Sequence, residues 1–384
     1  MGAFAGGTGA ADPQPLSWRD DPEASLSDWC IIVKAADQPG NVKTFHVHKA
    51  MIAAGGRRSE YFVRQCRSGS GASRMAEAAR GESTMELEPA AAEAMPIFLD
   101  YVYMGSLEAT TETGCALVHL ANYLLNPALH AAAVDFVDQD LTGRTAPFHL
   151  AHAELLSLDK IADAAVVVAA ENFHQYKDDE DDHPIANRVP LDHVRWFWAL
   201  HPQQVVRIVC SSDEKTGRSH ITAGADLTSR ILAQYVAARI SDIDEDFISA
   251  LFGDEERLLE AIDPSASIEL LKLATRFPLL PAAQDLRRRC IKEASEAWDT
   301  TLLPLYQGEK RRREEEEADA RQRTQRRSKK QKKAAGGSSD PTKDTQPKLP
   351  LGAGLPVDVQ LELLASMMEK VSENGYDGPS VGLY

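Results

Sequence analysis

The sequence has few cysteines, no long hydrophobic run and no recognisable leader. Its five cysteines lie at least 36 residues apart, which speaks against CxxC zinc ligation and against a compact disulfide framework. The longest apolar stretch, Ile161 to Ala170, contains Asp163 and is far shorter than the ~20 residues that cross a bilayer. The start, MGAFAGGTGAADPQPL, lacks the basic and apolar regions of a signal peptide. We therefore expect reduced thiols, no membrane partner and an intracellular protein, cytoplasmic or nuclear.

Catalytic and cofactor motifs are missing as well. The sequence contains no HExxH, GxSxG, GxxxxGK[ST] or GxGxxG pattern. Of the eleven histidines, His46 and His48 alternate on one strand face, and His149 and His152 lie at i,i+3, but neither pair has a third ligand at metal-binding spacing. Any of the cysteines could meet a histidine in space, although nothing in the local sequence favours this. The sequence predicts no enzyme, no cofactor and no metal site.

The charge is divided unevenly along the chain. The net charge is −16, yet residues 309–333 hold 12 of the 42 basic and 6 of the 58 acidic side chains. An acidic body gives no reason to expect direct nucleic-acid binding. The basic segment contains a run typical of a nuclear-import signal, for which a merely solvated charge run is the alternative. Its basic residues are Arg326, Arg327, Lys329, Lys330, Lys332 and Lys333.

The first part of the chain has an α+β pattern after a Gly-, Ala- and Pro-rich arm (1–26), which we expect to be flexible. Three short apolar segments are expected to be strands: 29–33, 42–45 and 83–88. Helices are expected within 47–65, interrupted at Gly55 and Gly56, and at about 95–102, 112–125 and 127–139. Because proline is tolerated only in the first turn of a helix, Pro96 predicts that the helix at about 95–102 begins near Glu93 or kinks.

The second part of the chain, from 147 to about 300, is expected to be all helical. Proline at the first helical position predicts helix starts at Pro202 and Pro264. A charged, solvated helix is expected at 301–333, a linker at 334–356 and a short amphipathic helix at 357–373, which together make a partly disordered tail. The last helix carries a two-heptad apolar seam that is too short for a coiled coil but suits a partner helix. The seam consists of Val357, Leu361, Leu364, Met368 and Val371.

The segment from Asp28 to Asp140 resembles a BTB/POZ domain. Five motifs of that family occur in order: Ser27-Asp28 before the first strand, Phe45-His-Val-His48-Lys49-Ala-Met-Ile-Ala53, Ser59-Glu-Tyr61-Phe62, Phe98-Leu-Asp-Tyr101-Val-Tyr103-Met-Gly105, and the helix from Leu117 to Leu125. The resemblance implies an α+β fold at 27–140, in which helices flank a small sheet. The region 147–300 is similar to the helical (BACK-like) extension that follows many such domains.

The family resemblance implies homodimerisation and, in many members, docking on a cullin. Asp28 and Lys49 occupy the positions of a charged pair at the dimer floor; a turn-ending aspartate and a surface lysine are the alternative. Residues 14–27 do not resemble the helix that many members exchange between subunits, so a smaller dimer interface or a monomer remains open. Met75-Ala76-Glu77 matches the apolar-x-Glu motif of cullin-binding members, for which a solvated helical turn is the alternative.

The function that these features predict is that of a non-enzymatic adaptor. The BTB domain would assemble the protein and link it to a cullin-RING ubiquitin ligase through Met75 and Glu77. Two alternatives remain from the sequence. One is a nuclear transcriptional regulator that uses the domain for oligomerisation, and the other is an oligomerising scaffold whose 357–371 seam binds a partner helix.

Overall fold

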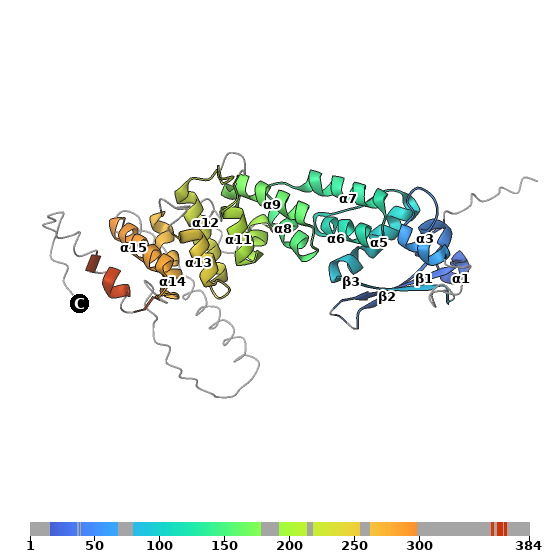
Figure 1. Ribbon diagram of the computed structural model, residues 1–384, viewed down its shortest axis with the longest axis horizontal. Coiled ribbons are helices and arrows are strands. Elements are labelled where there is room, and N and C mark those ends of the chain that lie inside the picture. Colours follow the sequence, from blue (N-terminus) through green and yellow to red (C-terminus); the bar gives the residue numbers. More distant parts are fainter. Residues whose placement is uncertain are drawn as a thin grey trace, which may run out of the picture. The chain divides into compact units, whose positions relative to one another are not determined.

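The structure is a computed structural model. It describes residues 16–36, 38, 40–67, 80–177, 192–212, 218–253, 262–297, 355–356, 359–363 and 365–366. The chain divides into two compact units, residues 1–168 and 169–384 (Figure 1), and each is described by itself. None of the described helices is long and apolar enough to cross a membrane.

The first unit is α+β, as predicted. Its elements are α1 (Pro22–Ser25), β1 (Trp29–Ala35), β2 (Val42–Val47), α2 (Lys49–Ile52), α3 (Glu60–Arg67), β3 (Glu82–Leu87), α5 (Pro89–Met104), α6 (Thr111–Tyr123), α7 (Pro127–Asp140) and α8 (Ala146–Leu155). The strand order is β2-β1-β3. Strand β1 pairs antiparallel with β2 and parallel with β3, with Ile31 opposite both Phe45 and Ser83. The three predicted strands are confirmed.

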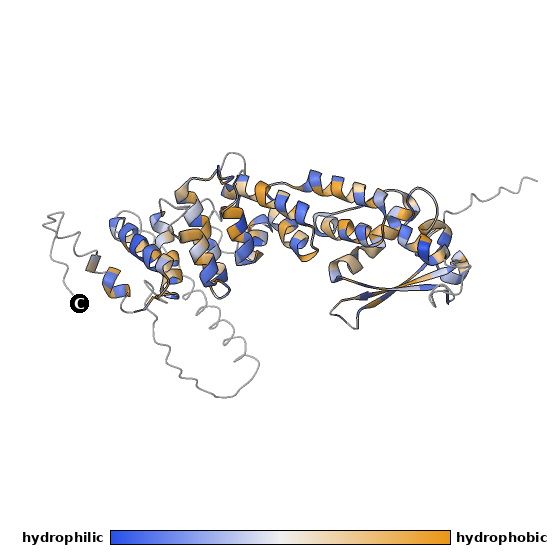
Figure 2. Cartoon of the chain, in the orientation of Figure 1, coloured by the Kyte–Doolittle hydropathy of each residue, from blue (hydrophilic) through white to orange (hydrophobic). Residues whose placement is uncertain are grey.

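One face of the sheet is buried under α5. Along β1, alternate residues from Trp29 to Ala35 are buried, and β3 repeats the pattern with Met85 and Leu87. This period of two places the apolar side chains on one side of the sheet. Phe98 and Leu99 of α5, which packs on β1, are fully buried. Figure 2 shows that hydrophobic and hydrophilic residues alternate along the helices.

Helix α5 begins four residues earlier than the sequence predicts. It starts at Pro89, in the first helical position, and continues through Pro96 to Met104. The prediction of a start near Glu93 is therefore wrong. Buried residues occur along the whole helix, among them Ala91, Ala92 and Ala94 in the first turns. Burial of this face outweighs the lost backbone hydrogen bond at Pro96.

The described part of the second unit is helical. After α9 (Asp159–Glu171), which joins the two units, its elements are the 3-10 helix η1 (Phe173–Tyr176), α10 (Asp192–Ala199), α11 (Pro202–Val209), α12 (Ala225–Arg239), α13 (Glu245–Phe252), α14 (Pro264–Thr275) and α15 (Pro281–Glu296). Extended pairing among the described residues of this unit is limited to one bridge, Ser212 with Ser219. The predicted starts at Pro202 and Pro264 are confirmed. The Asp263 carboxylate caps α14 by accepting from the Ser265 N–H.

An aromatic cluster forms the centre of the helical unit. The Tyr176 and Phe197 rings stack with centroids 4.6 Å apart, and Phe173 meets Phe197 edge to face at 5.5 Å. Tyr235 and Phe247 extend the cluster to α12 and α13. The Tyr235 hydroxyl donates to the Leu200 carbonyl at 2.8 Å, so this buried polar group is satisfied. The cluster ties η1, α10, α12 and α13 into one core.

Candidate protein-docking surfaces

Asp28 and Lys49 meet through the backbone of Lys49. The Asp28 carboxylate accepts a hydrogen bond from the Lys49 N–H at 2.7 Å. Lys49 is the first residue of α2, whose preceding residue, His48, makes no side-chain cap. The carboxylate therefore satisfies one of the unpaired amide groups that every helix start presents. The Lys49 ammonium lies 4.9 Å from the centroid of the Trp29 ring.

His48 does not cap α2 because both of its ring nitrogens bond elsewhere. Its Nε2–H donates to the Ser25 carbonyl at 2.7 Å, and in the neutral ring its Nδ1 accepts from the Tyr103 hydroxyl at 2.8 Å. The same hydroxyl accepts from the His48 backbone N–H. Burial raises the pKa of Tyr103. These bonds join α1, the start of α2 and α5. The Leu26 side chain, which follows α1, is 81% exposed.

The segment before α1 is also attached to the first unit. The Trp18 indole N–H donates to the Asp100 carboxylate at 2.9 Å, and its ring meets Phe45 edge to face with centroids 5.6 Å apart. Arg19 lies over the Trp18 ring and forms an ion pair with Asp100. The composition of residues 1–26 suggested a flexible arm throughout. Among the described residues 16–26 of this arm, Trp18 contacts β2 and α5, and Arg19 contacts α5.

A partly exposed apolar surface lies at the start of α3. We call Tyr61, Tyr123 and Leu125 the tyrosine surface. The two tyrosine rings are 5.8 Å apart, and Tyr123 and Leu125 are 39% and 42% exposed. The ion pair between Arg58 and Glu60 lies at the same end of α3. An apolar patch with charged groups at its edge is typical of a protein-interaction site.

The tyrosine surface is held by bonds between α3 and the turn that follows α6. The Ser59 hydroxyl donates to the Leu124 carbonyl at 2.6 Å, and the backbone N–H groups of Glu60 and Tyr61 donate to the carbonyls of Leu125 and Leu124. Leu125 adopts φ 51, a conformation rare for a residue with a side chain. Because the Leu124 and Leu125 carbonyls cap the start of α3, the backbone positions of Tyr61 and Tyr123 are fixed relative to each other. No local sequence pattern marks this surface, because the strained conformation of Leu125 cannot be read from the residue type.

Comparison with known families matches the first unit. The family model described as BTB/POZ domain matches residues 21–141. Residues 21–141 form a BTB/POZ domain. No curated protein was found to match the chain. The BTB domain is a protein-interaction module, so the chain has a protein-binding, adaptor-type role, and the domain generally supports oligomerisation.

Several predicted sites fall outside the described residues. Met75 and Glu77, the cullin-docking candidates, lie in the segment after α3, and the import run 326–333 lies in the tail. Of the predicted seam, only Leu361 is described, and it is 60% exposed. The buried residues of this region are others, Leu355, Val359 and Leu363.

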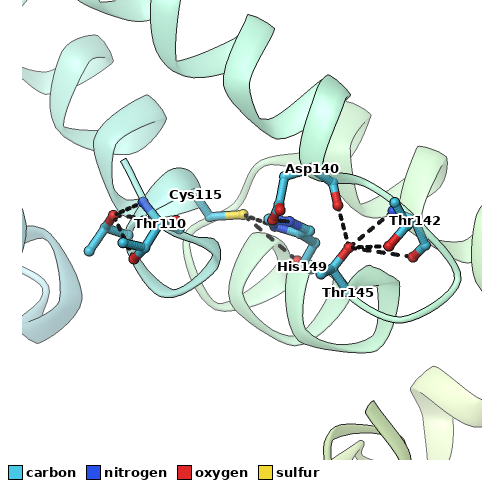
Figure 3. Close-up of polar contacts among 7 residues, drawn as sticks. Thr110, Cys115, Asp140, Thr142, Thr145 and His149 are labelled. Atoms are coloured by element: carbon cyan, nitrogen blue, oxygen red, sulfur yellow. Dashed lines mark hydrogen bonds and ion pairs between the residues drawn. The ribbon is translucent and has the colours of Figure 1, made fainter. Parts of the chain in front are cut away.

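The first unit, which contains the BTB/POZ domain and which we call the BTB unit, holds a buried cysteine–histidine–aspartate cluster (Figure 3). The Sγ of Cys115 on α6 lies 3.5 Å from Nδ1 of His149 on α8. The other ring nitrogen, Nε2, donates to the carboxylate of Asp140 at the end of α7 at 2.8 Å. The Thr145 hydroxyl donates to the Asp140 carbonyl, which holds the connection before α8. The three helices are thus joined by polar bonds.

The burial of this cluster argues against a nucleophilic role. Cys115 is 1% exposed and His149 is fully buried. Burial raises the pKa of the Cys115 thiol to about 12, with a smaller contribution from Asp140. A protonated thiol without access to solvent is a poor nucleophile. Among the described residues, no group of three or more His, Cys, Asp or Glu side chains could hold a metal ion.

Proposed function

We propose that this protein is an adaptor that links a bound substrate to a cullin-RING ubiquitin ligase. The BTB domain would bind the cullin and the helical unit, in a BACK-like role, would carry the substrate. No catalytic step is assigned to the chain. The adaptor acts inside the cell by holding the substrate near the ligase, which raises its effective concentration there.

The observation that supports this proposal is the tyrosine surface. Tyr61 lies on α3, and α3 leads directly into the segment that contains Met75 and Glu77. In this proposal a cullin that binds the segment after α3 also covers the start of that helix and contacts Tyr123 and Leu125 there. Methionine suits an adaptable apolar contact, and buried aromatic side chains are common in the energetically important part of an interface.

A binding assay with the full chain and a cullin amino-terminal domain tests the proposal. We expect Met75→Asp and Tyr123→Asp each to weaken binding at least tenfold, because both place a charge in an apolar contact. Leu155→Asp is the matched control, since Leu155 is 65% exposed at the end of α8 and is not part of the tyrosine surface. Unchanged binding after both Met75→Asp and Tyr123→Asp would refute this docking site.

Self-association through the floor of the domain is a second candidate. Leu26 is 81% exposed two residues before Asp28, so an apolar side chain stands beside the charged positions of the family's dimer floor. Light scattering on the full chain measures the oligomeric state. A dimer that dissociates in Leu26→Asp and persists in Leu155→Asp supports this interface, and a wild-type monomer at micromolar concentration contradicts it.

A further inference from the structure

A short segment near the carboxyl terminus is bound to the helical unit. Leu355, Val359 and Leu363 are at most 6% exposed, although only a few residues around them are described. Val359 and Leu363 are four residues apart and lie on one face of the helical piece 359–363, and Leu355 precedes that piece. The Gln360 N–H donates to the Pro356 carbonyl, and its side chain donates to the Leu355 carbonyl at 2.8 Å. We call residues 355–366 the C-terminal segment.

An ion pair identifies the helix to which this segment is bound. The guanidinium of Arg287 on α15 donates to the Glu362 carboxylate, with Nε 3.1 Å from Oε2. On the helical wheel Glu362 lies next to the buried Val359, on the side away from Leu363, so the ion pair borders the apolar face of the segment. Figure 1 shows the short helical pieces of the segment beside α15.

The receiving face of α15 has its own pattern. Leu286, Cys290 and Ala294 are fully buried, and α15 packs on α13 and α14. Arg287 and Ile291 lie one turn apart on an adjoining face, and Ile291 is 7% exposed. Helix α15 therefore has one face that packs on the core and a second, adjoining face that carries Arg287 and Ile291 one turn apart.

Leu361 points away from this contact. It lies about half a turn from both Val359 and Leu363 on a helix, and it is 60% exposed. The segment thus has a bound face and a free face. Three apolar side chains and one ion pair make a contact much smaller than a stable interface between separate proteins. We expect so small a contact to be reversible, and the covalent connection to α15 raises the local concentration of the segment.

We propose that the C-terminal segment is an intrachain plug on a helix-binding face of α15. The occupant in the resting protein is the segment of the same chain. The partner that displaces it is an amphipathic helix of the same pattern, with apolar residues at i, i+4 and i+8 and a carboxylate at i+7 opposite Arg287. Displacement of the plug opens the helical unit to that partner. This inference does not depend on cullin binding by the BTB domain.

Reach permits the intrachain arrangement. Residues 297–354 place 58 residues between the end of α15 and the segment. A chain of this length, at up to ~3.3–3.6 Å per residue, can span far more than the length of α15. Docking of the segment on a second copy is the alternative, and the oligomeric state of the wild type and its variants separates the two arrangements.

The test uses the full chain and a fluorescent peptide of residues 353–368 as the probe. Val359→Asp/Leu363→Asp removes the apolar contacts of the resident segment and should free the face. We expect this variant to bind the peptide at least tenfold more tightly than the wild type, measured by fluorescence anisotropy. Leu361→Asp, on the exposed side of the segment, is the matched control and should bind the peptide as weakly as the wild type.

Charge reversal tests the ion pair without changing the apolar contacts. Arg287→Glu in the freed variant should weaken peptide binding at least tenfold, and a peptide with Glu362→Arg should restore it. Arg288→Glu, at a neighbouring exposed position, should have no such effect.

Equal peptide binding by the wild type and the freed variant would overturn the proposal. So would a wild-type dimer that becomes monomeric in the freed variant, because the segment would then dock on a second copy. Circular dichroism measures whether the freed variant, Val359→Asp/Leu363→Asp, is folded. If it is unfolded, Glu362→Arg in the full chain takes its place: tighter peptide binding than the wild type supports the proposal, and equal binding overturns it.

Discussion

Gly105 illustrates how a single residue ends a helix. It follows α5 with φ 87, a conformation that residues with a side chain rarely adopt, and its N–H donates to the Tyr101 carbonyl. A Cβ at this position would come within 2.5 Å of the Arg57 guanidinium. That guanidinium donates to the carbonyls of Tyr101 and Val102, so it cannot move without losing both bonds.

We expect Gly105→Ala to lower the free energy of unfolding by about 2 kcal/mol or more, from backbone strain together with the displaced Arg57. Gly55→Ala separates the two causes. Gly55 also has a positive φ, but nothing lies within 4 Å of its added Cβ, so strain alone should cost about 1 kcal/mol. Chemical denaturation of both variants measures the difference. Equal losses would show that Arg57 moves freely.

The buried His149 predicts a dependence of stability on pH. Desolvation lowers its pKa below the ordinary value of 6.5, although Asp140 acts in the opposite direction. Below pH 6.5 the unfolded chain therefore binds more protons at this residue than the folded chain, and the free energy of unfolding falls as the pH falls. His152, whose pKa burial also lowers, acts in the same direction.

The measurement is the free energy of unfolding between pH 7 and pH 5. We expect His149→Gln to be less stable than the wild type at pH 7, because the Cys115 and Asp140 bonds are disturbed, and to lose less stability on acidification. His46→Gln, at an exposed position on β2, is the control and should keep the slope of the wild type. A slope unchanged by His149→Gln would show that other groups cause the acid sensitivity.

At the scale of elements, α5 contains an internal proline, Pro96, that lowers the stability of the helix. Pro96 lies in the interior of α5, where it removes a backbone donor and crowds the Ala92 carbonyl. We expect Pro96→Ala to raise the free energy of unfolding by about 1–3 kcal/mol, since alanine is the better helix former by ~3 kcal/mol. Pro89→Ala, in the first helical position where proline is tolerated, should change it by less than about 0.5 kcal/mol. A loss of stability in Pro96→Ala would mean that packing of the proline ring outweighs the helix.

Helix α2 offers a test of what Asp28 does. If its carboxylate acts as the cap of α2, Asp28→Ala should cost about 1 kcal/mol, whereas Asp28→Asn should cost much less because the amide oxygen still accepts from the Lys49 N–H. Lys49→Gln keeps that N–H and should also cost little. If the pair acts by its charges, Asp28→Asn and Lys49→Gln should instead change the stability or the oligomeric state as much as Asp28→Ala. Thermal unfolding and light scattering distinguish the two cases.

The strands and several helix starts could be predicted because their causes are local. Alternating burial in β1 and proline at the first position of α11 and α14 are visible in the residues themselves. The start of α5 could not be predicted, because burial along the helix outweighs the rule about Pro96. The tyrosine surface and the Cys115–His149–Asp140 cluster depend on residues from different helices, and no local pattern marks such meetings.

At the scale of the molecule, the BTB unit extends beyond its family match. The match ends at residue 141, whereas the compact unit includes α8, which packs on α6. His149 and Leu150 of α8 are fully buried there. The basic segment 309–333 lies outside the described residues.

The contribution of α8 can be measured with two fragments, residues 1–141 and 1–168. We expect the shorter one to be less stable by about 3 kcal/mol or more, because it loses burial of Leu150 and the His149 bonds to Cys115 and Asp140. In the longer fragment, Leu150→Ala should cost about 2–5 kcal/mol, whereas Leu155→Ala, at a position 65% exposed, should be nearly neutral. Chemical denaturation gives each value. If both fragments unfold with the same free energy, the family-matched residues fold without help, and α8 belongs energetically to the helices that follow it.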